Sequence, residues 1–293
     1  MQIIRKISQA QKAILKLKQS GKSVGFVPTM GALHSGHLSL ISRAREENDI
    51  VVVSIFVNPA QFGPNEDYLR YPRPFNKDSK LCRQHGVDII FAPSVKEMYP
   101  DDYLVYVNIE KMPDILCGKF RPGHFRGVAT IVTKLFNIVM PDNAYFGEKD
   151  FQQLKIITKM VSGLNFNINI VPCKTVREQS GLAKSSRNRY LSGIESANAS
   201  KIYGILQQIR GYVNNSHNKY IDINAMLNKY KLKLKLIPDS KLEYLDICNS
   251  NTLEVVTGRI RISKTVPLRV LVAIKIGKTR LIDNIGMGNT GGF

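Results

Sequence analysis

The chain has no tryptophan, few cysteines and no long apolar run. Its four cysteines, Cys82, Cys117, Cys173 and Cys248, form no Cys-x-x-Cys pair, which argues against a zinc site or a disulfide framework and predicts isolated buried thiols. Apolar runs such as Ile50–Val57 are far shorter than the roughly 20 residues that cross a bilayer. The first residues carry no secretory apolar segment and no small-residue cleavage pattern. We therefore expect a cytoplasmic protein with no membrane partner.

Acidic residues are scarce relative to basic ones. The chain has 42 Lys and Arg against 23 Asp and Glu, a formal net charge of +19. Such a surplus is compatible with a nucleic acid, an anionic small molecule or a lysine-rich surface. The lysines are dispersed along the chain, and no clustered basic face with interleaved aromatic residues is recognisable. The pattern favours a solvated basic surface and no nucleic-acid partner.

Strand-like and helix-like segments alternate through roughly the first 170 residues. The continuous β-branched run Ile50–Val57 is typical of a strand covered on both faces. The other predicted strands are Val24–Val27, Val87–Phe91, Ala144–Phe146 and Ile168–Val171, and the predicted helices are Gly36–Asn48, Asn76–His85, Gly127–Met140 and Phe151–Leu164. This alternation predicts an α/β fold, a Rossmann-like doubly wound parallel sheet in a domain of residues 1–175.

The pattern changes after about residue 176, and a smaller α+β domain with a short antiparallel sheet is expected over residues 176–293. Its predicted helices are Ser192–Val213 and Asp222–Leu236, and its predicted strands are Glu243–Cys248, Thr252–Val256 and Leu268–Ile276. The alternation in Lys231–Leu236 is typical of a strand, but we assign it to a helix end. We expect a loose tail at Gly286–Phe293.

The first helix carries signals at both of its ends. Ser8 followed by Gln11 predicts a capping box, and Gly21 predicts a helix stop.

The strongest chemical feature is the segment Pro28-Thr-Met-Gly-Ala-Leu-His34-Ser-Gly-His37. It places two of the five histidines between a predicted strand and a predicted helix. A helix N-terminus offers unpaired N–H groups and the positive end of a dipole, which suits phosphate. His34 and His37 can donate to phosphate oxygens as charge develops. The alternative is a pair of purely structural histidines.

Three further segments carry polar groups at comparable places. Gly147-Glu-Lys-Asp150 lies where a strand meets a helix, and Lys184-Ser-Ser-Arg-Asn188 combines two hydroxyls with two cations suited to phosphate. Both also fit plain exposed turns. Asn58 and Gln61 follow the most buried predicted strand, and ligands of open parallel sheets bind at the carboxyl ends of strands.

Together these segments resemble a known family. A His-x-Gly-His loop with a later Lys/Ser-rich loop is similar to the nucleotidyltransferase superfamily, which includes class I aminoacyl-tRNA synthetases. Within it, the chain resembles the pantothenate synthetase family through motifs that run in family order from about residue 1 to residue 285. Besides the histidine segment, they are Ser54-Ile-Phe-Val-Asn-Pro-Ala-Gln-Phe62, Tyr71-Pro-Arg73, Leu116-Cys-Gly118, Arg121-Pro-Gly-His-Phe125, Phe146-Gly-Glu-Lys-Asp-Phe-Gln-Gln153 and Ser185-Ser-Arg-Asn-Arg-Tyr-Leu-Ser192.

The resemblance implies an ATP-dependent ligase that activates pantoate as an acyl-adenylate and joins it to β-alanine, releasing AMP and pyrophosphate. ATP is then a substrate, Mg²⁺ travels with its phosphates, the protein has no metal site of its own, and the smaller domain closes over ATP. A homodimer is also implied.

The resemblance further implies a role for each matching residue. The catalytic residues would be His34, His37, Lys149 and Arg187. The ATP contacts would be Met30, Gly31, Ala32, Leu33, His34, Ser35, Gly36, His37, Gly147, Glu148, Lys149, Asp150, Val176, Lys184, Ser185, Ser186 and Arg187. The contacts to pantoate and β-alanine would be Gln61, Gln153 and Asn58.

The chain departs from the family pattern in two places. Lys184 stands where relatives often carry Met or Leu, and Glu178-Gln-Ser-Gly181 replaces the more usual Glu-Pro/Ala-Asp-Gly. We also predict a mobile lid at Phe62–Phe75, because this Gly- and Pro-containing segment directly follows the substrate amides.

Two other functions fit parts of the pattern. An aminoacyl-tRNA synthetase fragment would explain the histidines and the charge, but an anticodon-binding domain does not fit in the roughly 100 residues after the catalytic domain. An RNA-binding protein would need a clustered basic face with interleaved aromatic residues, and no such face is recognisable in the sequence.

Overall fold

The chain divides into two compact units. Unit 1 comprises Met1–Glu148 and Gln153–Lys174, and unit 2 comprises Lys149–Gln152 and Thr175–Phe293. The computed structural model describes residues 1–64, 66–216, 220–262 and 267–287. Within these ranges, no helix combines the length and the apolar character needed to cross a membrane.

Unit 1 is built on a six-stranded parallel sheet with the strand order β1-β4-β3-β2-β5-β6. The strands are β1 (Gln2–Ile4), β2 (Val24–Thr29), β3 (Ile50–Ile55), β4 (Ile89–Phe91), β5 (Asn143–Gly147) and β6 (Asn169–Cys173). The predicted Rossmann-like fold is thereby confirmed. From β2 the chain adds β3 and β4 on one side and later β5 and β6 on the other, so the strand order reverses between β2 and β5. In open parallel sheets, such a reversal leaves a crevice for ligands at the carboxyl ends of the strands.

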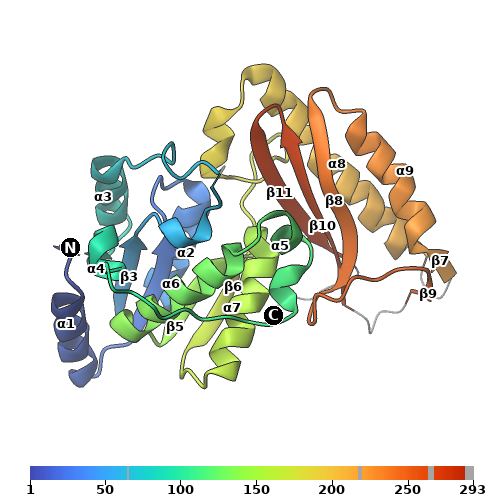
Figure 1. Cartoon of the computed structure of the whole chain (residues 1–293). Coiled ribbons are helices and arrows are strands. Elements are labelled where there is room, and N and C mark those ends of the chain that lie inside the picture. The colour runs from blue at the N-terminus through green and yellow to red at the C-terminus, as the bar shows by residue number, and fades with distance from the viewer. Residues whose placement is uncertain (65, 217–219, 263–266, 288–293) are drawn as a thin grey trace. The chain divides into compact units, whose positions relative to one another are not determined.

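Helices cover both faces of this sheet (Figure 1). Val27, Val51 and Val53 point toward α2, whereas Phe26 points the other way and meets Phe136 of α6 edge-on, with ring centroids 6.4 Å apart. The helices are α1 (Ile7–Gln19), α2 (Ser35–Glu47), α3 (Phe75–Gln84), α4 (Val95–Met98), α5 (Cys117–Phe120), α6 (His124–Val139) and α7 (Phe151–Gly163), with single 3₁₀ turns η1 (Pro59–Gln61), η2 (Met112–Asp114) and η3 (Glu148–Asp150).

The predicted capping box of the first helix is wrong. Helix α1 begins at Ile7, and its N-cap residue Lys6 makes no side-chain cap. The carboxylate of Glu97 takes that role instead, because it accepts a hydrogen bond from the Ile7 N–H at 2.9 Å. A partner 90 residues away in the chain leaves no local sequence signal. The predicted stop is confirmed, since α1 ends at Gln19 and Gly21 has a φ of +77°.

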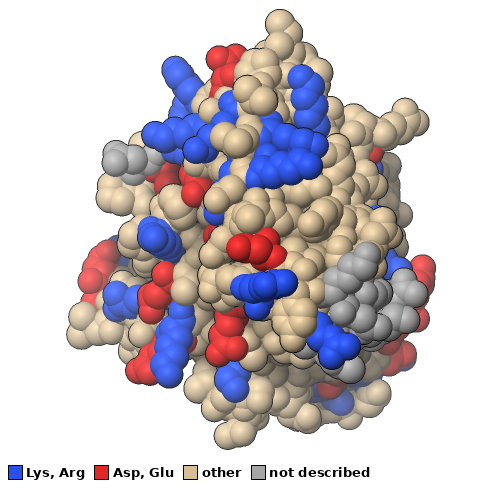
Figure 2. Space-filling model, turned by 90° about the vertical axis from the view of Figure 1, so that its right-hand side faces the viewer, with Lys and Arg blue, Asp and Glu red and all other residues tan. Residues whose placement is uncertain are grey.

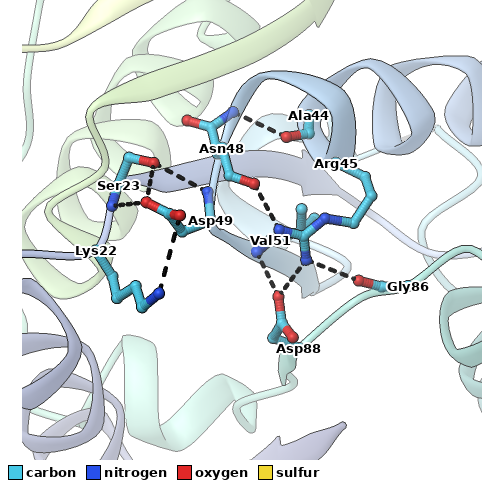
Figure 3. Close-up of polar contacts among 9 residues, drawn as sticks. All are labelled: Lys22, Ser23, Ala44, Arg45, Asn48, Asp49, Val51, Gly86 and Asp88. Carbon is cyan, nitrogen blue, oxygen red and sulfur yellow. Dashed lines mark hydrogen bonds and ion pairs between the residues drawn. The ribbon is translucent and has the colours of Figure 1, made fainter.

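Carboxylates tie the amino-terminal ends of the strands together (Figure 3). Asp49 accepts from the Ser23 N–H and hydroxyl at 2.9 and 2.8 Å, and these two hydrogen bonds lower the pKa of Asp49 below its usual range. Asp88 accepts from the Val51 N–H at 2.8 Å and from the Arg45 guanidinium at 2.7 Å. These contacts hold the amino-terminal ends of neighbouring strands together, whereas ligands of open parallel sheets bind at the carboxyl ends.

Unit 2 packs two helices, α8 (Gly193–Asn214) and α9 (Ile223–Lys235), on one face of a three-stranded antiparallel sheet (Figure 1). Alternate residues of the central strand, among them Val270, Val272 and Ile274, enter a core with Leu206 of α8 and Leu234 of α9. The sheet has the order β11-β10-β8. Its strands are β8 (Ser240–Asn249), β10 (Leu268–Ile276) and β11 (Thr279–Gly286), and a separate pair is formed by β7 (Tyr220–Asp222) and β9 (Arg259–Arg261).

Of the three strands predicted in unit 2, Glu243–Cys248 and Leu268–Ile276 are confirmed within β8 and β10, and the third is wrong. Thr252–Val256 is not a strand, since it makes only the isolated bridge from Cys248 to Val255. The third strand of the sheet is β11, which pairs with β10 across a turn at Gly277, where φ is +54°. The predicted tail begins inside this strand, at Gly286, and residues 288–293 lie outside the described residues.

The assignment of Lys231–Leu236 to a helix end is confirmed, because α9 continues to Lys235. Of the three leucines there, only Leu234 is buried, and Leu232 and Leu236 are 63% and 81% exposed.

Candidate functional site

The loop between β2 and α2 turns sharply through two left-handed residues. Gly31 has a φ of +81° and Ala32 a φ of +52°, a conformation that is unfavourable for a residue with a Cβ atom. The carboxylate of Asp78, on α3, holds the turn by accepting from the Ala32 N–H at 2.8 Å and the Leu33 N–H at 2.9 Å. Asp78 is only 1% exposed, so its two backbone partners replace the water that a buried carboxylate needs.

The two histidines cap α2 and have a defined tautomer. Nδ1 of His34 accepts from the Gly36 N–H at 3.1 Å, and Nδ1 of His37 accepts from the His34 N–H at 3.4 Å. The ring centroids are 4.1 Å apart. A backbone N–H can only donate, so each neutral ring carries its proton on Nε2. The same two rings therefore cap the helix and present Nε2–H donors at its N-terminus. A structural role for the histidines does not exclude the predicted chemical role.

The two amides predicted to contact substrate lie after the neighbouring strand, β3, where η1 begins. The Asn58 amide donates from Nδ2 to Gln61 Oε1 at 3.1 Å, and Gln61 Nε2 lies 2.9 Å from the sulfur of Met30. Asn58 is 1% exposed and Gln61 is 8% exposed. The fold therefore brings Met30, Asn58 and Gln61 together at the carboxyl ends of two adjacent strands.

Arg121 and His124 contact the main chain at Gln61, and neither is among the predicted site residues. The main-chain carbonyl of Gln61 accepts from Arg121 at 3.3 Å and lies 2.8 Å from His124 Nδ1. Arg121 also grips the carboxylate of Glu66, which lies in the segment predicted to be a lid. Their presence in the Arg121–Phe125 motif was the available signal. For Asp78, the sequence offered no signal beyond its place in a predicted helix.

Gly147 ends β5, across the strand-order reversal from β2. Gly147 and Glu148 are the last residues of the first segment of unit 1, and Lys149 and Asp150 belong to unit 2. Lys149 Nζ lies 3.7 Å from the Asp150 carboxylate, and the Lys149 carbonyl accepts from Asn284 at 3.0 Å. Gln153 is half-buried at the start of α7.

The predicted phosphate loop of unit 2 is organised around Glu178. Its carboxylate accepts from Lys184 at 3.1 Å and from the Asn188 amide at 3.4 Å. The carbonyl of Val176 accepts from the Lys184 N–H at 2.9 Å, and Ser185 caps the turn η4 (Ser186–Tyr190) by accepting from the Arg187 N–H at 3.3 Å. The lysine that departs from the family pattern thus has a carboxylate partner within its own loop.

The prediction of isolated buried thiols is confirmed, since all four cysteines are buried and none of them is in a disulfide. Burial raises the pKa of the Cys82 thiol to about 12, which leaves it unreactive at neutral pH. Among the described residues, no group of three or more His, Cys, Asp or Glu side chains could hold a metal ion.

Comparisons with known proteins cover nearly the whole chain. A family model described as pantoate-beta-alanine ligase matches residues 2–286. The pantothenate synthetase of Caldicellulosiruptor saccharolyticus is 49% identical, covering 97% of this chain and 99% of that protein, and that of Sulfurihydrogenibium sp. is 51% identical with the same coverage of both.

Two solved structures are similar over the same length. The pantothenate synthetase of Thermus thermophilus has a TM-score of 0.88 at 41% identity and covers 97% of this chain and 99% of its own. A pantoate-beta-alanine ligase from Francisella tularensis, described as complexed with "Beta-gamma ATP" and β-alanine, has a TM-score of 0.79 at 40% identity and covers 97% of each chain.

Proposed function

The chain belongs to the pantoate–β-alanine ligase family, and from that premise we propose how its own residues carry out the ATP-dependent joining of pantoate to β-alanine. The observation that carries the proposal is the β2–α2 loop. It sets two imidazole Nε2–H donors at the N-terminus of a 13-residue helix, next in the sheet to a strand that ends in a buried amide pair. The helix N-terminus with its two imidazole donors suits a polyphosphate, and the amide pair suits a hydroxyl-rich acid.

In the first step, a pantoate carboxylate oxygen forms a bond to the α-phosphorus of ATP, and the bond from that phosphorus to the bridging oxygen of pyrophosphate breaks. Alignment and charge stabilisation matter more here than a general base. His34, His37, Lys149 and Arg187 would stabilise the phosphate charge, with Ser185 and Ser186 as further donors. Gln61 and Gln153 would hold pantoate, and Mg²⁺ would enter and leave with the phosphates.

The remaining residues would contact other parts of the ATP molecule. The backbone of residues 30–37 would lie along the nucleotide, Gly147 and Asp150 would meet the ribose, and Val176 would pack near adenine. In the second step, the amine of β-alanine forms a bond to the acyl carbon, AMP leaves, and the amine gives its proton to solvent.

The proposal extends to organisation and location. Residues 1–175 would bind nucleotide and pantoate, and residues 176–293 would close over ATP. A homodimer is supported by an exposed apolar run, in which Leu104, Val105 and Tyr106 are 88%, 69% and 44% exposed. Four thiols that are in no disulfide suit a reducing compartment, which supports the cytoplasm.

The test is the substrate dependence of AMP release. We expect steady formation of AMP and pyrophosphate only when ATP, Mg²⁺, pantoate and β-alanine are all present. Equal AMP release without pantoate, or release that depends on an amino acid and tRNA, would contradict the proposal.

A further inference from the structure

Tyr99, which follows α4, reaches the buried amide pair from outside the loops that carry the family motifs. Its hydroxyl donates to Asn58 Oδ1 at 2.8 Å. Its ring packs against Phe56, with centroids 6.3 Å apart, and meets Tyr103 edge-on at 5.0 Å. This burial raises the pKa of Tyr99, so the hydroxyl keeps its proton and remains a donor at neutral pH.

Two backbone partners identify which end of the Asn58 amide is the oxygen and which is the nitrogen. The Gly127 carbonyl, 3.1 Å from Asn58 Nδ2, can only accept, and the Ala60 N–H, 3.3 Å from Asn58 Oδ1, can only donate. The oxygen and nitrogen of a side-chain amide look alike in shape, but these two backbone partners distinguish them. A Cβ on Gly127 would lie 2.1 Å from the Ala60 carbonyl, so the glycine allows α6 to come close enough to supply its carbonyl.

The orientation of Asn58 in turn fixes that of Gln61. Since Asn58 offers a donor, the Gln61 atom 3.1 Å away must be the acceptor Oε1. The Gln61 amide nitrogen is therefore turned toward Met30, whose sulfur lies 2.9 Å away. A thioether is a weak acceptor, so an oxygen of a bound substrate can replace it.

We propose that Tyr99 is a positioning residue for the acid substrate: through Asn58 it holds Gln61 with its amide NH₂ turned toward an oxygen of pantoate. This inference rests on the proposed role of Gln61 in binding pantoate. Without the Tyr99 hydroxyl, Asn58 Oδ1 keeps only the long bond from Ala60, and the Asn58–Gln61 pair can rotate away from its donating arrangement. The loss would fall on pantoate binding and would leave ATP binding unchanged.

The first measurement compares KM values for Tyr99→Phe and for its neighbour Tyr103→Phe, which removes a hydroxyl from the same aromatic cluster. Losing one buried hydrogen bond corresponds to roughly a 3- to 10-fold effect. We expect Tyr99→Phe to raise the KM for pantoate by roughly that factor, with the KM for ATP within about 2-fold of wild type. Tyr103→Phe should match the wild type, and equal melting temperatures would show that both variants fold.

A double-mutant cycle then asks whether Tyr99 acts through Gln61. If it does, Tyr99→Phe has no further effect on the KM for pantoate once Gln61→Ala is present. Additive effects, a wild-type KM for Tyr99→Phe, or a rise of equal size for ATP would overturn the inference. If any of these results were accompanied by a large effect of Gln61→Ala alone, the proposed pantoate site would still be supported and only the role of Tyr99 would be wrong. If Gln61→Ala had no effect, the pantoate site itself would be wrong.

Discussion

His37 caps α2, and we propose that the same side chain stabilises the transition state, so its removal should separate the two roles. We expect His37→Ala to slow adenylate formation by ~10²–10³-fold, because one preorganised transition-state donor is lost. Loss of a helix cap should also lower the free energy of unfolding by about 0.5–2 kcal/mol. Single-turnover measurement of pyrophosphate release and urea unfolding report the two effects independently.

The matched control for His37 is a cap on another helix. Asp222 caps α9 by accepting from the Ala225 N–H at 2.9 Å, and Asp222→Ala should lose similar stability with normal pyrophosphate release. If His37→Ala behaved like this control, the histidine would be a cap alone.

Lys184 and Arg187 lie in the same loop, but we expect them to differ in importance. Lys184 is paired with Glu178, and both side chains are about one-third exposed, so the pair contributes little to stability. Arg187 can grip two phosphate oxygens at once with its planar guanidinium. Lys184→Met should change kcat/KM for ATP by less than ~10-fold, and Arg187→Ala should lower it by at least ~100-fold. Equal damage at matched ionic strength would show that this chain depends on a cation many relatives lack.

The residues that we propose to have a chemical role could be selected from the sequence where the chain gathers them locally. The histidines and the two amides, Asn58 and Gln61, each occupy one short segment at a strand end. Asp78 and Tyr99 were not predictable, because their partners lie 46 and 41 residues away in the chain. The local sequence around an aspartate in a helix, or around a tyrosine that follows a helix, does not show whether the side chain is buried against a distant loop or exposed at the surface.

At the scale of elements, α3 holds the β2–α2 loop through Asp78. We expect Asp78→Asn to place an amide donor against a backbone N–H, which lowers the free energy of unfolding by about 1–3 kcal/mol. The loop carries Met30 and His34, and a small displacement of catalytic groups can reduce rate by ~10²-fold. kcat/KM for ATP should therefore fall by roughly 10- to 100-fold, measured alongside urea unfolding.

The control for Asp78 is a carboxylate at the other edge of the same sheet. Asp88 also accepts from a backbone N–H and sits among structural contacts (Figure 3). Asp88→Asn should reduce stability and leave kcat/KM within about 2-fold of wild type. A similar loss of activity in both variants would point to general destabilisation.

The predicted lid contains Glu66, and its mobility stays a prediction. Its rate of amide exchange should change when ligands bind. Within the described residues it carries its own contacts, with the Phe62 ring 5.4 Å from Tyr68 and Glu66 held by Arg121. We expect amide exchange in the described residues of the predicted lid, Phe62–Phe75, to be fast in the free enzyme and slower with ATP and pantoate. Glu66→Gln should speed exchange in the free enzyme. Strong protection without ligand would contradict the lid.

The elements themselves were predictable in proportion to their length and regularity. The buried β-branched run of β3 was found, as were the helices with a continuous apolar face. The short strands β1, β7 and β9, with three residues each, carry too little pattern to be recognised. β11 was missed although it follows β10 by one tight turn, because polar residues such as Asp283 and Asn284 are buried in it.

At the scale of the whole molecule, the chain carries a net charge of +19. On the face drawn in Figure 2, basic side chains gather in one group and also stand singly among acidic ones. Charge spread in this way acts mainly through its summed field at long range, which influences the arrival of charged ligands more than their final contacts.

Ionic strength should therefore affect the three substrates in the order of their negative charge. Raising salt from about 10 mM to 150 mM shortens the Debye length from ~30 Å to ~8 Å. We expect kcat/KM to fall by roughly 3- to 10-fold for ATP, less for pantoate, and by under 2-fold for β-alanine, which carries no net charge at neutral pH. kcat should change little for any of them, because saturating substrate removes the encounter step. Two salts with different anions separate screening from competition by an anion at the phosphate site. An equal fall for all three substrates would mean that the positive surplus serves solubility alone and does not guide substrates to the site.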